Sequence, residues 1–105
     1  MGLFGLFSQK DSTSEVKSYL NKDAVILDVR TKKEWDEDGN IPSAQHIVLN
    51  LVPLEIETIK SWNKPVIAVC KSGGRSGQAM QFLRQNGVDA INGGPWQNVA
   101  QHLGE

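Results

Sequence analysis

One stretch constrains the fold more than any other: a short apolar run that passes directly into a glycine-containing loop and then into a helical pattern. The run covers residues 66–69, the loop residues 70–76, and the helical pattern residues 77–84, before Asn86 and Gly87 end it. A continuous apolar run without alternation is typical of a strand that is covered on both faces. This strand–loop–helix unit therefore predicts a sheet with helices packed against it.

The rest of the chain repeats this alternation of strands and helices. We predict strands at residues 24–29, 45–48 and 88–91, followed by a turn at residues 92–94. We predict helices from a capping box at residues 12–15 to about residue 20, from a second capping box over residues 31–36, from an Asn50 cap to Trp62, and from Pro95 to Leu103. The predicted fold class is α/β, with a central, mostly parallel sheet flanked by helices on both faces.

Length and composition indicate one globular domain. The chain has 105 residues, of which 39% are hydrophobic. We divide it into an N-terminal apolar segment, residues 1–10, which we expect to pack on the domain, and the domain itself, residues 11–105. The apolar start is too short for a membrane span and lacks the cationic start and cleavage pattern of a signal peptide, so we expect a cytoplasmic protein without a membrane partner.

Charge and cysteine content narrow the function further. The formal net charge is −1, so we expect no nucleic-acid partner. The single cysteine excludes an internal disulfide and suits a reducing compartment. His46 and His102 have no metal-ligand spacing with Cys, Asp or Glu, so we expect neither a metal site nor a cofactor.

The candidate site is the loop that begins with this cysteine. Cys70 ends the predicted strand, and ligands of open α/β sheets bind beyond the carboxyl ends of the strands. The loop also holds two glycines, two hydroxyls and two cations: Gly73, Gly74, Ser72, Ser76, Lys71 and Arg75. Glycines let backbone N–H groups converge, and a helix N-terminus and cations favour a thiolate. We therefore expect an anion-binding nucleophilic cysteine that acts on a substrate such as thiosulfate or phosphate; the alternative is an inert cysteine at a strand end.

Several segments in the same order resemble the signatures of one family. These are the loop at residues 70–76, Asp28-Val29-Arg30 with Glu34-Trp35, the segment Gly39-Asn40-Ile41-Pro42-Ser43-Ala44, and Gly87 through Gly93-Gly94 to Trp96. Together they make the chain similar to a single-domain rhodanese, a sulfurtransferase module, over about residues 24–99. The resemblance implies a rhodanese-like fold and a thiosulfate sulfurtransferase activity.

The resemblance also implies a role for each residue of the site. Cys70 would carry sulfane sulfur as a persulfide, taken from a small anionic donor and passed to a thiol or cyanide-type acceptor, or to a sulfur-accepting protein. The N–H groups of residues 71–75 would stabilise the persulfide, Lys71 and Arg75 would attract the donor, and Ser72 or Ser76 would hydrogen-bond it. Asp28 and Arg30 would support the loop through buried polar bonds, and Trp96 would lie near the pocket.

Two departures and two alternatives remain. The family commonly has Trp four residues after the double glycine, where this chain has Asn98, and Asn40 and Ser43 replace family residues. A related cysteine-dependent phosphatase or arsenate reductase would have five residues between Cys and Arg, whereas four lie between Cys70 and Arg75. A catalytically silent protein-docking module is the other alternative, which the retained cysteine, glycines and cations argue against.

Overall fold

The computed structural model describes residues 13–104, and the predictions for residues 1–12 lie outside this part. Residues 13–21 are helical. The elements that follow are β1 (Val25–Asp28), α2 (Lys32–Glu37), β2 (Gln45–His46), η1 (Leu49–Leu51), η2 (Pro53–Glu55), α3 (Ile56–Ser61), β3 (Val66–Cys70), α4 (Gly74–Gln85), β4 (Ala90–Pro95) and α5 (Trp96–Ala100). The strands form one sheet in the order β2-β1-β3-β4, and every pair is parallel.

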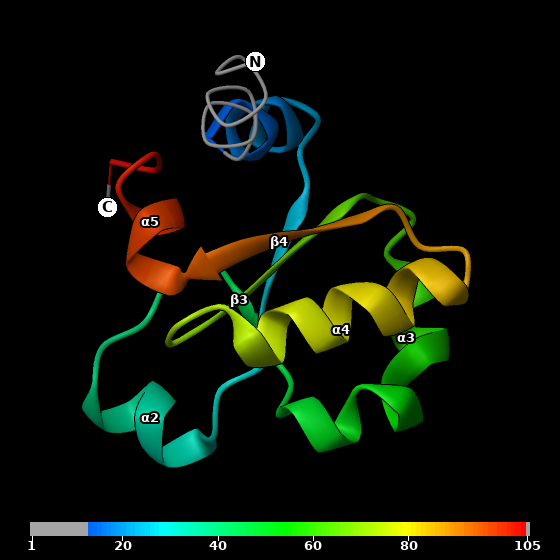
Figure 1. Ribbon diagram of the computed structural model, residues 1–105, viewed down its shortest axis with the longest axis horizontal. Helices are drawn as coiled ribbons and strands as arrows, with labels where there is room; N and C mark the ends of the chain where they lie inside the picture. The colour runs from blue at the N-terminus through cyan, green and yellow to red at the C-terminus, as the bar shows by residue number, and fades with distance from the viewer. Residues whose placement is uncertain (1–12, 105) are drawn as a thin grey trace, which may run out of the picture.

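Helices cover both faces of this sheet, which confirms the predicted fold class. On one face α3 and α4 pack on the strands, and on the other lie α5 and the helix at residues 13–21 (Figure 1). The central strand β3 is buried at all five positions, as its unbroken apolar run predicted. Its alternate residues divide between two apolar clusters, with Ala68 and Cys70 in one and Ile67 and Val69 in the other. Within residues 13–104, no helix is long and apolar enough to cross a membrane.

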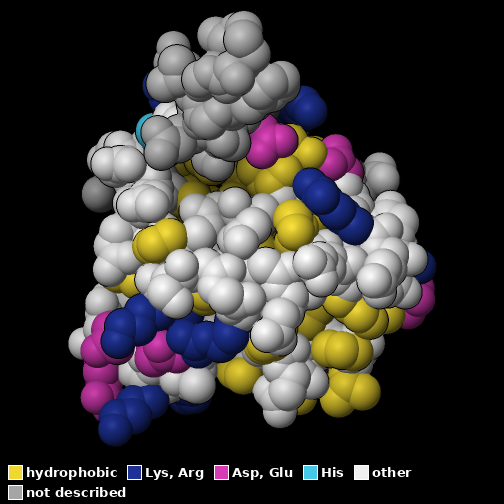
Figure 2. All heavy atoms as spheres, in the orientation of Figure 1, with side chains coloured by type: hydrophobic (Ala, Val, Ile, Leu, Met, Phe, Trp, Pro, Cys, Tyr) yellow, Lys and Arg dark blue, Asp and Glu magenta, His cyan; other side chains and the backbone are white. Residues whose placement is uncertain are grey.

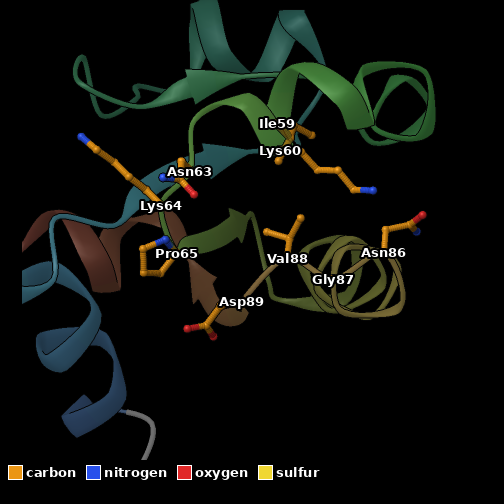
Figure 3. Close-up of a pocket in the computed structure, with 9 residues that line it drawn as sticks. All are labelled: Ile59, Lys60, Asn63, Lys64, Pro65, Asn86, Gly87, Val88 and Asp89. Atoms are coloured by element: carbon orange, nitrogen blue, oxygen red, sulfur yellow. The ribbon is translucent and has the colours of Figure 1, made fainter.

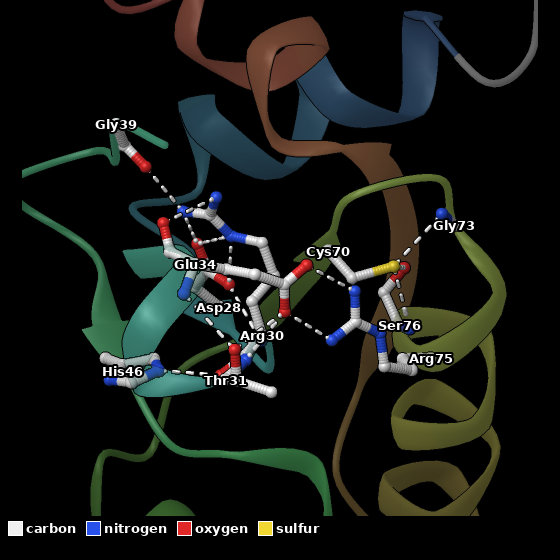
Figure 4. A network of polar contacts seen from close by, with 10 residues as sticks. All are labelled: Asp28, Arg30, Thr31, Glu34, Gly39, His46, Cys70, Gly73, Arg75 and Ser76. Atoms are coloured by element: carbon white, nitrogen blue, oxygen red, sulfur yellow. Dashed lines mark hydrogen bonds and ion pairs between the residues drawn. The ribbon is translucent and has the colours of Figure 1, made fainter. Parts of the chain in front are cut away.

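The capping box predicted at Thr31 is present. The Thr31 hydroxyl accepts a hydrogen bond from the Glu34 N–H at 3.2 Å, and the Glu34 carboxylate accepts one from the Thr31 N–H at 3.0 Å. These two bonds start α2 immediately after β1. They also hold the Glu34 side chain at the carboxyl edge of the sheet, next to the cysteine loop (Figure 4).

The segment between β2 and α3 differs from the prediction. The strand β2 is only two residues long, and the Asn50 cap is wrong because Asn50 lies inside η1, which has no side-chain cap. Two 3₁₀ turns precede the α-helix. Pro53 begins the second of them, and it has no N–H to donate to a continuous helix ladder. The apolar positions were predicted correctly, since Val52 and Ile59 are both 1% exposed.

The end of the sheet also differs from the prediction. Residues 92–94 were expected to turn, but they continue β4 and contain a β-bulge opposite Ala68 and Val69. Gly93 makes the bulge possible, because a Cβ there would lie 2.7 Å from Ile67 Cγ2 and 2.9 Å from Val99 Cγ2. Gly94 has a φ of +76°, which also favours glycine. The bulge brings Asn92 to the cysteine loop, as described below.

Candidate active site

Cys70 is the last residue of β3 and is fully buried, so its sulfur lies at the carboxyl edge of the sheet. The loop after it turns back over the sulfur. The Gly73 N–H donates a hydrogen bond to Cys70 Sγ at 3.0 Å and the Ser76 N–H donates one at 3.4 Å, while Ser76 Oγ lies 3.2 Å from Sγ (Figure 4). Gly73 has a φ of +106°, and this conformation makes the tight turn into α4 possible.

The surroundings of Cys70 favour the thiolate. Burial is the largest single influence and by itself raises the pKa of Cys70. The Ser76 hydroxyl and the N–H groups of Ser76, Gly73 and Ser72 act in the opposite direction, and together they lower the pKa of Cys70 below its ordinary value. The helix α4, 12 residues long, also begins here with its positive end near the sulfur. These hydrogen bonds favour the ionised form of the Cys70 thiol, which is the more nucleophilic form.

Arg75 is held in an ion pair. Its two terminal guanidinium nitrogens donate to the two carboxylate oxygens of Glu34, at 2.7 and 2.9 Å (Figure 4). The Arg75 guanidinium holds the pKa of Glu34 at about 2, with help from the Thr31 N–H and hydroxyl. Arg75 therefore joins the loop to α2. An anionic donor that bound Arg75 would compete with Glu34 for the positive charge of the guanidinium.

This ion pair gives a pH-dependent prediction. Because the pKa of Glu34 falls from 4.5 to about 2 on folding, the pair adds stability above pH 4.5 that is lost as the pH falls towards 2. We expect the free energy of unfolding to fall more steeply over this range in wild type than in Glu34→Gln, which cannot titrate. Urea unfolding at several pH values measures both slopes, and equal slopes would contradict the structural importance of the pair.

Asp28 and Arg30 form a second, buried network behind the loop. Both side chains are 1% exposed, and Arg30 Nη2 lies 2.9 Å from Asp28 Oδ2. The same Arg30 nitrogen donates to the Gly39 carbonyl at 2.8 Å, and the Arg30 guanidinium carbon lies 5.0 Å from the centre of the Trp96 ring. His46 Nε2 lies 2.7 Å from the Arg30 carbonyl oxygen (Figure 4). The structure thus places Asp28, Arg30 and Trp96 together, with the Arg30 guanidinium between the carboxylate and the Trp96 ring.

The remaining loop residues face solvent. Lys71, Ser72 and Gly74 are exposed, and Lys71 has no ion pair with another residue in the range 13–104. The lower left of the molecule in Figure 2 carries basic and acidic side chains side by side, and the lower right is largely apolar. Because the Arg75 charge is paired, Lys71 is the loop cation whose charge stays available to an approaching anion.

Sequence reasoning missed two residues of the site. Glu34 was assigned only to a capping box and a family signature, and nothing in the sequence predicted its contact with Arg75, 41 residues away. Asn92 was assigned to a turn, but its amide nitrogen donates to the Gly73 carbonyl at 3.0 Å and its amide oxygen lies 2.6 Å from Ser76 Oγ. Its position two residues before Gly94, in a segment rich in glycine, was the only available signal.

A hollow at the opposite edge of the sheet is not part of this site. It is lined by the segments that precede β3 and β4, including Lys60, Lys64, Pro65 and Asp89 (Figure 3). It is lined by no Cys, Ser, Thr, Tyr or His side chain, and Lys64 is already paired with Asp23 at 2.7 Å. Among the described residues, no group of three or more His, Cys, Asp or Glu side chains could hold a metal ion. Cys70 and its loop therefore remain the candidate site.

A parallel α/β sheet with a buried, hydrogen-bonded cysteine between its central strand and the next helix defines a class: cysteine-loop domains of sulfur or phosphorus chemistry. Within this class the chain belongs to the rhodanese-like domain family, whose model matches residues 12–97. This confirms the resemblance seen in the sequence.

Individual proteins and solved structures are also similar to this chain. A protein of Allochromatium vinosum named sulfurtransferase is 35% identical over 70 residues, which cover 67% of this chain and 64% of that protein. The chain thus matches slightly less than two thirds of that relative. The crystal structure of SSP1007 from Staphylococcus saprophyticus has a TM-score of 0.65 and 37% identity, covering 79% of this chain and 84% of that one. A Rhodopseudomonas palustris protein described as a possible tyrosine phosphatase has a TM-score of 0.63 and 27% identity, covering 81% and 71%.

Proposed function

We propose that this protein transfers sulfane sulfur from an anionic donor, such as thiosulfate, a persulfide or a polysulfide, to a thiol or cyanide-type acceptor through a persulfide on Cys70. The observation that carries the proposal is the contact between the loop and the sulfur. The Gly73 N–H, at the middle of the loop, donates directly to Cys70 Sγ at 3.0 Å. A loop that closes on the sulfur itself suits a carrier of one added sulfur atom.

Two displacement steps complete the transfer. The Cys70 thiolate attacks the outer sulfur of thiosulfate, a new S–S bond forms, and sulfite leaves with the electron pair of the broken S–S bond. An acceptor thiolate or cyanide then attacks the outer sulfur of the persulfide, and Cys70 leaves as a thiolate. The outer sulfur is the anionic atom of the persulfide, and the N–H groups of residues 71–75 would stabilise it. Lys71, exposed and without an ion pair to a described residue, would attract the anionic donor.

The phosphatase alternative is weaker on the same geometry. A phosphoryl group bound at Cys70 would need the converging N–H groups and the arginine for its own oxygens. Here the Gly73 N–H is bonded to sulfur and both terminal nitrogens of Arg75 are bonded to Glu34. The four-residue spacing between Cys70 and Arg75 also leaves a short loop. The docking-module alternative predicts no chemistry at Cys70.

One experiment separates these functions. The purified protein is incubated in turn with thiosulfate, a polysulfide and glutathione persulfide, and its intact mass is measured. We expect the mass to increase by one sulfur atom and to return to its original value after addition of cyanide or a thiol. If no donor changes the mass, the sulfurtransferase proposal fails and the docking module is favoured. Hydrolysis of an aryl phosphate that depends on Cys70 would favour the phosphatase.

A further inference from the structure

The orientation of the Asn92 amide is determined by two backbone groups. The Gly73 carbonyl can only accept a hydrogen bond, so the nitrogen that lies 3.0 Å from it is the Asn92 amide nitrogen. The Gly94 N–H can only donate, so the atom that lies 2.9 Å from it is the Asn92 amide oxygen. The Asn92 oxygen is therefore the atom that faces Ser76 Oγ, and the side chain cannot be turned over without losing both bonds.

This orientation determines where the Ser76 proton lies. An amide oxygen has no proton to donate, so at 2.6 Å the Ser76 hydroxyl is the donor and Asn92 the acceptor. The hydroxyl has a single proton, and Cys70 Sγ lies 3.2 Å from the same Ser76 oxygen. While Asn92 receives the proton, Ser76 can only accept from the sulfur, which requires Cys70 to be a thiol that donates its S–H. A thiolate has no proton to donate, so it can only accept a hydrogen bond from the Ser76 hydroxyl.

We propose that Asn92 is a positioning residue for the Cys70 nucleophile. Asn92 accepts the hydrogen bond of the Ser76 hydroxyl while Cys70 is a thiol, and the hydroxyl turns to donate to the sulfur when Cys70 ionises. The inference deepens the proposed function and rests on it only in taking Cys70 as the reacting group. On ionisation the thiol proton leaves to a base in solvent, and the Ser76 hydroxyl rotates from Asn92 to the sulfur. The Asn92 oxygen keeps its bond from the Gly94 N–H throughout.

The Ser76 hydroxyl, which switches between Asn92 and the sulfur, returns to Asn92 during sulfur transfer. When Cys70 Sγ bonds to an outer sulfur, Sγ is no longer anionic and becomes a weak acceptor. The Ser76 hydroxyl then bonds to Asn92 again, because the amide oxygen is the stronger acceptor. Asn92 therefore stabilises the thiol and the persulfide relative to the free thiolate. This lowers the free-energy cost of converting the thiolate into the persulfide. When the Ser76 hydroxyl loses its hydrogen bond to the thiolate, it regains one to Asn92.

Glycines on neighbouring elements leave room for the Asn92 side chain. Gly77, in the first turn of α4, faces the Asn92 side chain, and a Cβ at Gly77 would lie 3.2 Å from the Asn92 amide nitrogen. A Cβ at Gly73 would lie 4.0 Å from the same atom. The bulge in β4 completes the arrangement, since it turns Gly94 so that its N–H meets the Asn92 oxygen. Small residues on the loop, on α4 and on β4 thus surround one polar side chain.

Charged groups also act on Cys70, independently of Asn92 and Ser76. The charge of Cys70 interacts with the Arg75 guanidinium, which comes from α4 and is paired with Glu34 of α2. Asp28, at the end of β1, also interacts with Arg75 and is paired with Arg30. Neither β4 nor α5 contributes an ionisable side chain. A substitution at Asn92 consequently removes no charged group near the sulfur.

The test is a titration of Cys70 in four proteins: wild type, Asn92→Ala, Ser76→Ala and the double variant. Because the chain has a single cysteine, the ultraviolet absorbance of the thiolate, with Cys70→Ser as the blank, reports this residue alone. We expect Asn92→Ala to lower the pKa of Cys70 by about half a unit to one unit, the equivalent of one neutral hydrogen bond. Ser76→Ala should raise it. In the Ser76→Ala background, Asn92→Ala should have no further effect.

The double variant separates the switch from a merely structural role. If Asn92→Ala shifts the pKa equally in both backgrounds, or raises it, Asn92 acts by holding the loop and the proposal is wrong. The control is Asn50→Ala, another exposed asparagine, whose side chain makes no cap bond and which should leave the pKa unchanged. The titration needs no sulfur donor. A shift without any loading of sulfur would therefore refute the proposed function and leave the role of Asn92 intact.

Discussion

Cys70→Ser is expected to abolish both persulfide formation and sulfur transfer. The serine hydroxyl is not ionised near neutral pH and does not form a stable bond to sulfane sulfur, so no carrier remains. The oxygen can still accept from the Gly73 and Ser76 N–H groups, so the buried position remains satisfied. We expect the melting temperature to change little. Intact mass after thiosulfate treatment and the rate of thiocyanate formation from cyanide measure the loss.

Ser18→Ala is the control, because it removes a hydroxyl from an exposed position outside the cysteine loop and leaves the sulfur in place. It should keep persulfide formation. A large loss of stability in Cys70→Ser would instead support the alternative in which Cys70 is an inert residue at a strand end. Residual sulfur loading in that variant would show that another group carries the sulfur.

Asp28→Ala is expected to produce the largest loss of stability. It removes the carboxylate from a pair whose side chains are both 1% exposed and leaves the Arg30 cation buried without its partner. Breaking a buried pair in this way costs roughly 3–5 kcal/mol of unfolding free energy. Urea unfolding measures it directly. We also expect sulfur transfer to fall, because the Arg30 guanidinium contacts Trp96, which follows the residue of β4 that pairs with Cys70.

Asp36→Ala provides the matched control. Asp36 pairs with Lys32 at 2.8 Å, nearly the same separation as in the buried pair, but the two side chains are 51% and 80% exposed. Exposed pairs contribute at most about 1 kcal/mol, so this variant should remain close to wild type. Replacing both Asp28 and Arg30 by apolar residues should recover part of the loss, since no unpaired charge then remains. Equal losses from Asp28→Ala and Asp36→Ala would show that burial does not determine the cost.

Much of the fold followed from the sequence because its elements are encoded locally. The unbroken apolar run of β3, the capping box of α2 and the glycine after α4 each depend on a few adjacent residues. The predictions that failed are for segments in which tertiary packing overrides local preference. Asn92, Gly93 and Gly94 have the composition of a turn, but pairing with β3 holds them in the sheet as a bulge. Pro53 divides one expected helix into shorter turns.

The sequence by itself determined the parts of the site that lie within one short segment: Cys70 at the end of a strand, the glycine turn, and Ser76 six residues after Cys70. Their contacts with the sulfur join residues no more than six apart. Only the tertiary structure decided which side chains act on that segment. Glu34 meets Arg75 across 41 residues and Asn92 meets Ser76 across 16, because parallel strands bring the loops that follow them to one edge of the sheet.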